Sequence, residues 1–227
     1  MARPRQPLIS RSAAVAAAIK IIDAEGLEAL SLPRLAQELG VKAPSLYYHF
    51  ADKSAILAAV SRTIIAQTVV PRKPGPERWP EWFVQVSVNS RKVILRHRNA
   101  APLLLQYLPR QLLTEQYDDA ARYLEANGVP ASLHVQILDG LETLTYGSAI
   151  AEAMGPPNIR KATYPGVETG RYPALARAQD ANPYTARKLF EESIRNFLRG
   201  VLGPADVLDR YPVPDRSHSL PGVADHT

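Results

Sequence analysis

The 227-residue sequence contains no cysteine, which excludes a disulfide framework, a thiolate metal site and a thiol nucleophile. It also lacks an uninterrupted apolar run of about 18 residues, so we expect no transmembrane helix. The N-terminal segment MARPRQPLIS has no apolar stretch of the length that a signal peptide needs, and we therefore expect a cytoplasmic protein. Apolar residues make up 46% of the chain, as in an ordinary globular protein.

Sequence motifs of the common enzyme classes are also missing. There is no Gly-rich phosphate loop, no histidine pair at the helical spacing of a metal site and no Gly-x-Ser-x-Gly turn. The five histidines are scattered, and acidic pairs such as Asp118-Asp119 are adjacent on a helix and point apart. We predict a protein that is not an enzyme and that holds no cofactor and no metal ion.

Proline, by contrast, is abundant, and its distribution divides the chain. Twelve of the 20 prolines fall in the segments 71–80, 155–175 and 203–227. Because proline lacks a backbone N–H and fixes φ, we expect connections or a tail there. The sequence between these segments is rich in alanine and leucine at helical spacing, which predicts an all-α fold.

The same pattern predicts the domain organisation. We expect one domain over residues 1–60, a connecting helix over about 53–70, a larger helical domain over 71–202 and a disordered tail over 203–227. The charge is also uneven, because residues 1–100 carry 15 basic and 7 acidic side chains, whereas the remainder carries 12 and 15. The basic part indicates an anionic partner.

The first sixty residues contain four short helical patterns. Apolar spacing predicts a first helix over about 10–25 and a second from Ser31, a favourable N-cap, to Gly40. A third is expected over 44–50, and a fourth begins after Asp52. Two short helices joined by a tight turn with glycine form the helix-turn-helix pattern, whose second helix enters the major groove of DNA.

The stretch 14–60, with LSLPRLAQELGVKAPSLYYHFADKSAIL at its centre, resembles the DNA-binding domain of the tetracycline-repressor (TetR) family. The resemblance depends on Leu30-Ser31, Leu35-Ala36, Leu39-Gly40-Val41, Leu46-Tyr47, His49-Phe50, Lys53 and Leu57. It implies an N-terminal three-helix helix-turn-helix domain that contacts DNA through Ser31, Arg34, Lys42, Ala43, Pro44, Ser45, Tyr47, Tyr48, His49 and Lys53. One departure is Pro33, which replaces an often polar or basic residue of the family, so that Arg34 would take over its phosphate contact.

Other roles for these side chains remain open. Tyr47 and His49 also suit packing between helices, and Lys42 and Lys53 also suit a solvated surface. The arginines at positions 3, 5 and 11 form a basic arm that fits the minor groove or phosphates, or else an ordinary disordered tail.

The remaining sequence predicts helices over about 79–98, 114–126, 130–154 and 182–202, with a short helix before Pro109. This layout is similar to the regulatory domain of the TetR family, although the match is looser. The resemblance implies a small-molecule pocket and a homodimer in which the helices over 130–154 and 182–202 form a four-helix bundle. A face of small residues favours close helix approach, although a monomeric core helix is the alternative; these residues are Gly140, Thr143, Gly147 and Ser148.

Candidate pocket residues combine apolar side chains with a few polar ones, although each also suits plain core packing. They are Trp82, Val86, Ser90, His97, Leu103, Leu104, Tyr107, Gln136, Leu144 and Tyr146. Tetracycline-binding members hold the drug through Asn, Phe and metal-ligating His side chains, and the resemblance aligns Val86, Ser90 and Leu104 with those positions. We therefore expect a more hydrophobic ligand than magnesium–tetracycline.

Together these features predict a ligand-responsive transcriptional regulator, specifically a homodimeric repressor that a small hydrophobic molecule releases from a palindromic DNA operator. The expected partners are double-stranded DNA, the effector and a second copy of the chain, with no membrane. The alternative function is a dimeric helical adaptor that acts by protein contact without DNA binding.

Overall fold

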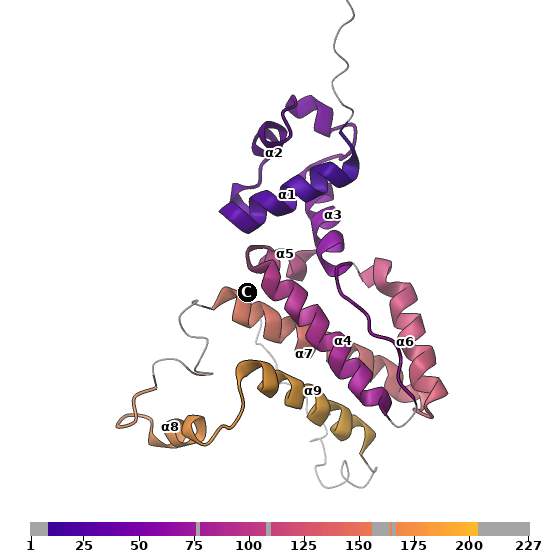
Figure 1. The fold of residues 1–227 in the computed structure, drawn as a ribbon, viewed down its shortest axis with the longest axis vertical. Helices are drawn as coiled ribbons and strands as arrows, with labels where there is room; N and C mark the ends of the chain where they lie inside the picture. Colours follow the sequence, from indigo (N-terminus) through magenta and orange to yellow (C-terminus); the bar gives the residue numbers. More distant parts are fainter. Residues whose placement is uncertain (1–8, 76–77, 108–109, 156–163, 165–166, 204–227) are drawn as a thin grey trace, which may run out of the picture.

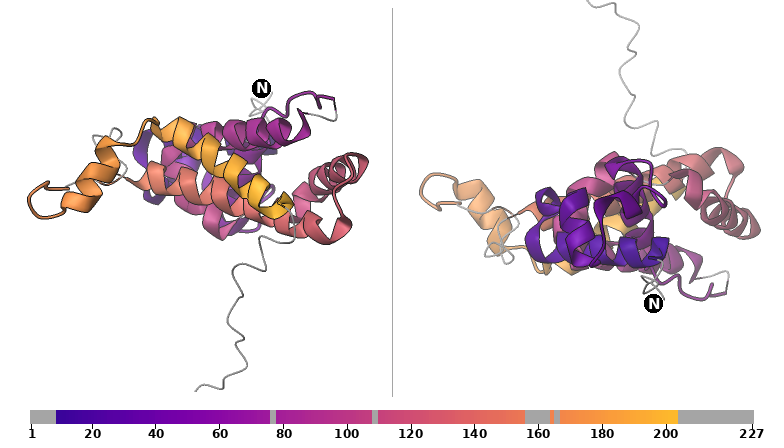
Figure 2. Two further views of the ribbon diagram at one scale, coloured as in Figure 1. Left: turned by 90° about the horizontal axis from the view of Figure 1, so that it is seen from below. Right: turned by 90° about the horizontal axis from the view of Figure 1, so that it is seen from above.

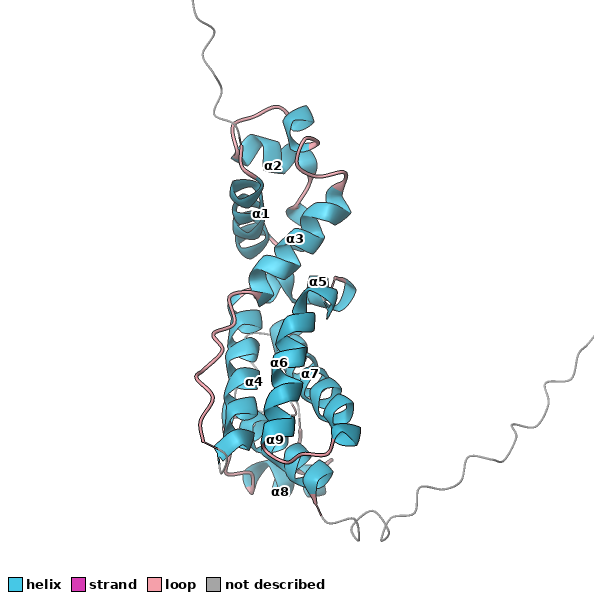
Figure 3. Cartoon of the chain, turned by 90° about the vertical axis from the view of Figure 1, so that its right-hand side faces the viewer, coloured by secondary structure: helices cyan, strands magenta, loops and turns pink. Residues whose placement is uncertain are grey.

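The computed structural model describes residues 9–75, 78–107, 110–155, 164 and 167–203, and within these ranges every regular element is a helix (Figure 1). This confirms the all-α prediction. A smaller part at one end contains the first three α-helices, and a larger part contains the remaining six (Figure 1). Figure 3 shows α3 running from the smaller part toward the larger one. The predicted tail over 203–227 lies, apart from its first residue, outside the described residues.

The smaller part closely follows the apolar pattern of the sequence. Its elements are α1 (Arg11–Glu25), η1 (Leu27–Ala29), α2 (Leu32–Glu38), η2 (Ala43–Leu46) and α3 (Lys53–Ile65). Ser31 caps α2 by accepting a hydrogen bond from the Arg34 N–H, and Asp52 caps α3 by accepting from the Ala55 N–H at 2.7 Å. Such caps satisfy amide groups that have no carbonyl partner within the helix.

Two elements of this part are shorter than predicted. The third helix is a 3₁₀-helix of four residues, η2, followed by turns through His49. Asp52 already has the extended backbone of the cap of α3, so little chain remains after Pro44 for a regular α-helix. The predicted connecting helix ends at Ile65 rather than near residue 70. Pro71 disfavours helical geometry in Val70, which accounts for the end of the helical pattern there but not for the earlier end at Ile65.

The larger part is a helical bundle with one projecting helix. Its elements are α4 (Trp79–Arg96), η4 (Arg98–Ala100), α5 (Ala101–Gln106), η5 (Arg110–Leu113), α6 (Thr114–Ala126), α7 (Ala131–Met154), α8 (Pro173–Asp180) and α9 (Ala186–Leu202). The sequence analysis did not predict α8, which stands away from the bundle in two views (Figures 1 and 2). Helix α9 begins four residues later than predicted.

The two parts share apolar cores. Ile22, Leu35 and Leu46 are buried in the core of the smaller part, and Val93 and Leu103 from the larger part join the same cluster. A further cluster buries Ile65 of α3 against Ile94, Ala101, Leu104, Ala149 and Ile150. Since cores are densely packed, a displacement of α3 is transmitted to both parts.

Helices α7 and α9 approach each other closely in the larger part. An added Cβ at Gly140 of α7 would lie 2.1 Å from the ring of Phe197 of α9. The small side chain at this position therefore accommodates a neighbouring helix of the same chain. Gly147, farther along α7, has open space where its Cβ would be.

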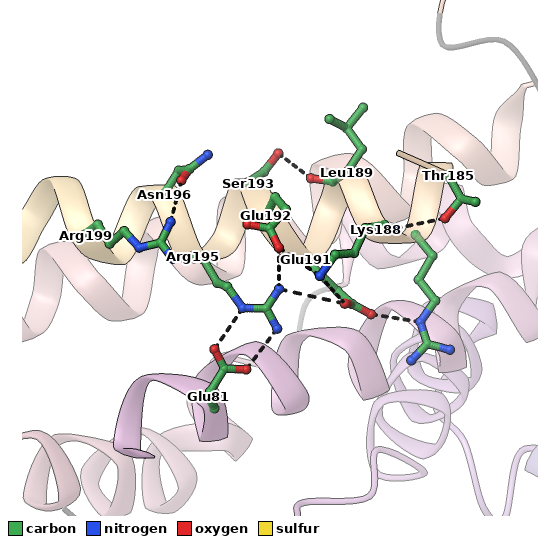
Figure 4. Close-up of polar contacts among 11 residues, drawn as sticks. Glu81, Thr185, Lys188, Leu189, Glu191, Glu192, Ser193, Arg195, Asn196 and Arg199 are labelled. Carbon is green, nitrogen blue, oxygen red and sulfur yellow. Dashed lines mark hydrogen bonds and ion pairs between the residues drawn. The ribbon is translucent and has the colours of Figure 1, made fainter. Parts of the chain in front are cut away.

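A polar bridge connects α9 to the start of α4 (Figure 4). The guanidinium of Arg195 donates to both carboxylate oxygens of Glu81, at 2.8 and 2.9 Å, and also contacts Glu192. The hydrogen bond from Arg195 holds the pKa of Glu81 below its usual value. This two-pronged geometry orients α9 across α4.

Candidate DNA interface and ligand cavity

Helix η2 presents an exposed aromatic surface next to a buried anchor. Leu46 and Phe50 are buried and hold the segment against α1 and α3. Between them, Tyr47 is 57% exposed and Tyr48 is 89% exposed, whereas His49 is partly buried. The turn before η2 depends on Gly40, whose φ of 65° suits glycine. Tyr47 and Tyr48 are thus available to a partner in this structure.

Cationic groups flank this aromatic surface. Lys42 directly precedes η2, Lys53 is the first residue of α3, and both are exposed. The N-terminus of α3 adds a partial positive charge from the helix dipole beside Lys53. Of the other predicted DNA contacts, Pro44 and Ser31 are exposed, whereas Ala43, Ser45 and His49 are partly buried. The geometry suits contact with a polyanion.

Arg34 has a different environment from the one predicted. Its guanidinium donates to Glu25 at 2.6 and 3.2 Å and to Glu38 at 3.0 Å. Glu38 also accepts from Lys20, so this network joins α1 to α2. The hydrogen bond from Arg34 lowers the pKa of Glu25. In this structure Arg34 connects helices, and a phosphate contact would compete with two carboxylates.

Arg11, predicted as part of a basic arm, belongs to the first turn of α1. Its Nη1 donates to the backbone oxygen of His49 at 2.6 Å, and its guanidinium lies 4.5 Å from the centre of the Phe50 ring. These contacts hold the turn after η2. The other two arginines of the predicted arm, at positions 3 and 5, lie outside the described residues.

A cavity of about 320 Å³ lies in the larger part, below the end of α3. Its walls come from α4, α6, α7 and the segment that follows α3. Four of the predicted ligand residues line it, namely Trp82, Val86, Ser90 and Tyr146. Phe83, Leu138 and Leu141 complete an apolar wall.

Six predicted ligand residues lie elsewhere. Leu103 and Leu104 are buried in the shared cores, Tyr107 packs against the core of the smaller part, and Gln136 is exposed. Leu144 packs in the core of the larger part without lining the cavity. His97 is buried at the end of α4 and forms contacts between the two parts. Apart from the exposed Gln136, these residues face inward as helical spacing predicted, but they face other parts of the interior than the cavity.

Several polar lining residues were not predicted. Tyr117 donates to Glu142 at one side of the cavity, and Arg110 Nε also donates to Glu142, at 2.8 Å. Thr68 and Thr145 contribute buried hydroxyl oxygens that have no hydrogen-bond partner within the described part of the chain. Thr145 follows Ile137 and Leu141 at intervals of four residues, so a hydroxyl within an apolar stripe was the available sequence signal.

Two tyrosine side chains on the cavity wall, Tyr146 and Tyr117, have raised pKa values. Burial raises the pKa of Tyr146, with a smaller contribution from nearby Glu142. Burial and then the hydrogen bond to Glu142 raise the pKa of Tyr117. Both phenols therefore remain protonated at neutral pH and add no charge to the cavity.

The described residues contain no cluster of three or more His, Asp or Glu side chains that would hold a metal ion. Within the same ranges, no helix is both long enough and apolar enough to cross a membrane. The structure thus has two candidate functional features. One is the cationic, aromatic surface formed by η2, the turn after it and the start of α3, here called the cationic tip, and the other is the apolar cavity. Helix α3 connects them.

Comparison with known proteins connects the two features. Residues 14–60 match the family described as "Bacterial regulatory proteins, tetR family", and residues 70–203 match the family described as "Tetracyclin repressor-like, C-terminal domain". The chain belongs to the TetR family. TetR-family proteins are typically ligand-responsive, DNA-binding repressors. In this TetR-family chain the first match contains η2, and the second contains most of the residues that line the cavity.

Individual relatives agree with this membership. The tetracycline repressor protein class E of Escherichia coli is 30% identical over 139 residues, covering 61% of this chain and 66% of that protein. The match thus spans just under two thirds of the repressor's length. ActR of Streptomyces coelicolor in complex with actinorhodin is 25% identical, with a TM-score of 0.69 and coverage of 86% and 97% of the two chains. BioQ with its double-stranded DNA operator, 21% identical with a TM-score of 0.60, shares the fold over 85% of this chain and 98% of that chain.

Proposed function

We propose that this TetR-family chain is a cytoplasmic transcriptional repressor that leaves a palindromic DNA operator when a small, mainly hydrophobic molecule binds. The observation that supports this most strongly is the position of α3. This helix begins at the cationic tip with Lys53, and Ile65 at its other end lines the cavity. An occupant of the cavity therefore contacts the element that carries part of the DNA surface.

The proposed DNA surface is centred on η2. Lys42, Ala43, Pro44 and Ser45 approach base edges in the major groove, and Tyr47, Tyr48 and His49 contact the backbone or thymine methyl groups. Ser31 and Lys53 bind phosphates, and Arg34 reaches phosphate only by exchanging its carboxylate partners. Two copies of η2 bind successive major grooves about 34–36 Å apart.

The operator complex requires a homodimer, which we assign to α7 and α9. Both helices lie along one side of the bundle in Figure 2, and Val135 of α7 is 77% exposed. Exposed apolar side chains on long neighbouring helices are typical of four-helix-bundle dimers. Gly147 leaves open space on α7 for a partner helix.

The effector site is the cavity between α4, α6 and α7. The relatives include a tetracycline repressor and ActR in complex with actinorhodin, and these small organic molecules support an organic effector. Val86 and Ser90 line the cavity at positions aligned with tetracycline-binding residues of the family, so we propose a ligand other than magnesium–tetracycline.

Contacts beside the cavity suggest how a ligand changes the DNA-binding part. Thr68 lines the cavity, and its neighbour Gln67 offers Oε1 to Nε2 of His97 at 3.1 Å. Nδ1 of the same ring meets the carboxylate of Asp23 in α1. A ligand that moves the segment after α3 therefore changes the Gln67–His97–Asp23 contacts that hold α1 against the larger part. The ligand shifts the equilibrium only if it binds the released state more tightly.

Fluorescence polarisation with labelled DNA from the region upstream of the protein's own gene tests the proposal. We expect salt-dependent binding that prefers this DNA over a scrambled duplex. Failure to bind any duplex, with the dimer intact in gel filtration, would favour the alternative function of an adaptor that acts by protein contact. A monomer at micromolar concentration would contradict the dimer.

A further inference from the structure

The cavity contains two buried hydroxyl groups that the protein itself does not satisfy. Oγ1 of Thr68 and Oγ1 of Thr145 are buried and have no hydrogen-bond partner within the described residues. Thr145 is only 3% exposed, and both residues line the same cavity. A buried polar group without a partner costs free energy, so native proteins usually provide one. A hydrogen-bonding group on the occupant of the cavity would satisfy these hydroxyls.

The apolar wall indicates the body of that occupant. Trp82 and Phe83 pack edge to face with ring centres 4.8 Å apart, and both line the cavity. The indole N–H of Trp82 donates to the backbone oxygen of Pro71 at 2.9 Å, so the hydrogen-bonding group of this side chain is already engaged. Trp82 therefore offers the occupant an aromatic surface rather than a polar group, and such a surface favours a ring compound.

The charged lining residues indicate that the occupant is neutral. No Lys, Arg or His is among the described residues of the wall, which leaves an anion without a partner. The acidic members of the wall are Asp119 and Glu142, and each is already paired, with Lys73 at 2.7 Å and with Arg110 respectively. A buried charge without its own partner is strongly disfavoured.

From these observations we infer that the cavity binds a neutral ring compound with an oxygen function that hydrogen-bonds to Thr68 and Thr145. A hydroxyl or ketone oxygen fits, because a threonine hydroxyl both donates and accepts. This inference rests on the ligand-binding function proposed above and specifies its ligand class. Thr68 follows α3 and Thr145 belongs to α7, so a ligand that bonds both hydroxyls would connect the segment that leads from the DNA-binding part to the bundle.

A matched set of tricyclic probes tests the inference on the full chain by equilibrium dialysis. The probes are fluorene, fluorenone, fluorenol and the fluorenecarboxylate anion. We expect the neutral alcohol or ketone to bind roughly 5- to 10-fold more tightly than fluorene, because only they satisfy the threonine hydroxyls. The anion is expected to bind at least about tenfold more weakly than the neutral oxygen compounds.

Substitutions of the two threonines test whether their hydroxyls cause the preference for fluorenol over fluorene. Thr68→Val and Thr145→Val should each reduce the preference for fluorenol over fluorene, and the double variant should abolish it. Thr63→Val, an exposed position of α3 outside the cavity, is the matched control and should keep the preference. Circular dichroism verifies that each variant is folded.

The outcomes distinguish this inference from the proposed function. Equal binding of fluorene and fluorenol, tighter binding of the anion, or an unchanged preference in the double variant overturns the ligand class. If no probe binds, the ligand class is overturned as well. DNA binding is measured without a probe, so its result tests the DNA-binding function separately. If fluorenol binds through the two threonines but does not release operator DNA, the ligand class holds and the ligand-responsive function fails.

Discussion

Nδ1 of His97 lies 2.8 Å from Oδ2 of Asp23, which joins the end of α4 to α1 across the boundary between the two parts of the chain. The Asn99 side chain also donates to the backbone oxygen of Asp23, at 3.0 Å. A carboxylate oxygen accepts, so Nδ1 is the donor in this contact, and Nε2 of the same ring lies 3.1 Å from Oε1 of Gln67. His97 thus contacts both α1 and the segment that lines the cavity.

Replacing Asp23 by Asn should weaken the coupling between ligand and DNA. We expect ligand affinity to stay the same while the ligand-induced loss of DNA affinity falls by roughly 5-fold or more, within the usual coupling energy of about 1–3 kcal/mol. Fluorescence polarisation with and without ligand measures this change. Asp118→Asn, on the exposed surface of α6, is the control. Unchanged coupling in Asp23→Asn would mean that the signal bypasses His97.

Replacing Lys53 by Ala should weaken DNA binding without unfolding the protein, because its side chain is exposed at the start of α3. The loss of one phosphate contact per protomer should reduce the slope of log affinity against log salt by about 1 for each protomer. Polarisation titrations at several salt concentrations give this slope. Lys92→Ala, on the exposed face of α4, should leave it unchanged. Equal slopes for both variants would remove Lys53 from the interface.

Replacing Gly140 by Ala should destabilise the packing of α7 against α9. The new Cβ would be 2.1 Å from the Phe197 ring, so the ring or the helix must move. We expect a loss of about 1–3 kcal/mol in the free energy of unfolding, as for other overpacked cores. Urea denaturation measures it. Gly200→Ala in α9 meets no atom within 4 Å and is the control. A loss of equal size in the control would point to helix backbone effects instead.

The Glu81–Arg195 bridge should make stability depend on pH in the acidic range. The pKa of Glu81 is lowered from 4.5, chiefly by the Arg195 hydrogen bond. The stabilisation is therefore fully present above pH 4.5 and is lost as the pH falls through the lower folded-state pKa. Partial exposure limits it to about 0.5–1 kcal/mol.

The variant Glu81→Gln tests this dependence. At pH 7 it should unfold at a lower urea concentration than the native chain, and the difference should shrink progressively at acidic pH. Glu28→Gln, an exposed position in η1, controls for the general loss of a carboxylate. A difference that stays constant down to strongly acidic pH would show that Glu81 stabilises the protein through packing rather than through its charge.

The sequence predicted the smaller part well because its signals are local. Ser31 and Asp52 are strong helix caps, and Gly40 marks a turn with a positive φ, a conformation that few other residues adopt. Local pattern did not reveal the partners of Arg34, because Glu25 belongs to a different helix and its proximity depends on how α1 packs on α2. Long-range packing, not propensity, determines that contact.

The cavity was harder to predict for the same reason. Trp82, Val86 and Ser90 share one face of α4, and helical spacing places them together. His97 continues that helix but lies at the boundary between the two parts, where it meets Asp23. Thr68 follows the end of α3 in an irregular segment, and its position depends on the whole bundle. Spacing within one helix identifies inward-facing residues but not which of several interiors they face.

Replacing Thr145 by Val should leave the ligand-free protein as stable as the native chain, or more stable. The buried hydroxyl has no partner within the described residues, and valine has nearly the same shape, so the change removes an unsatisfied polar atom without leaving a void. We expect a gain of about 0–1 kcal/mol in the free energy of unfolding, measured by urea denaturation without ligand. Thr63→Val, at an exposed position of α3, should change it by less than about 0.5 kcal/mol. A loss of more than about 1 kcal/mol in Thr145→Val alone would mean that the protein itself satisfies this hydroxyl, and the argument for a ligand oxygen at Thr145 would fail with it.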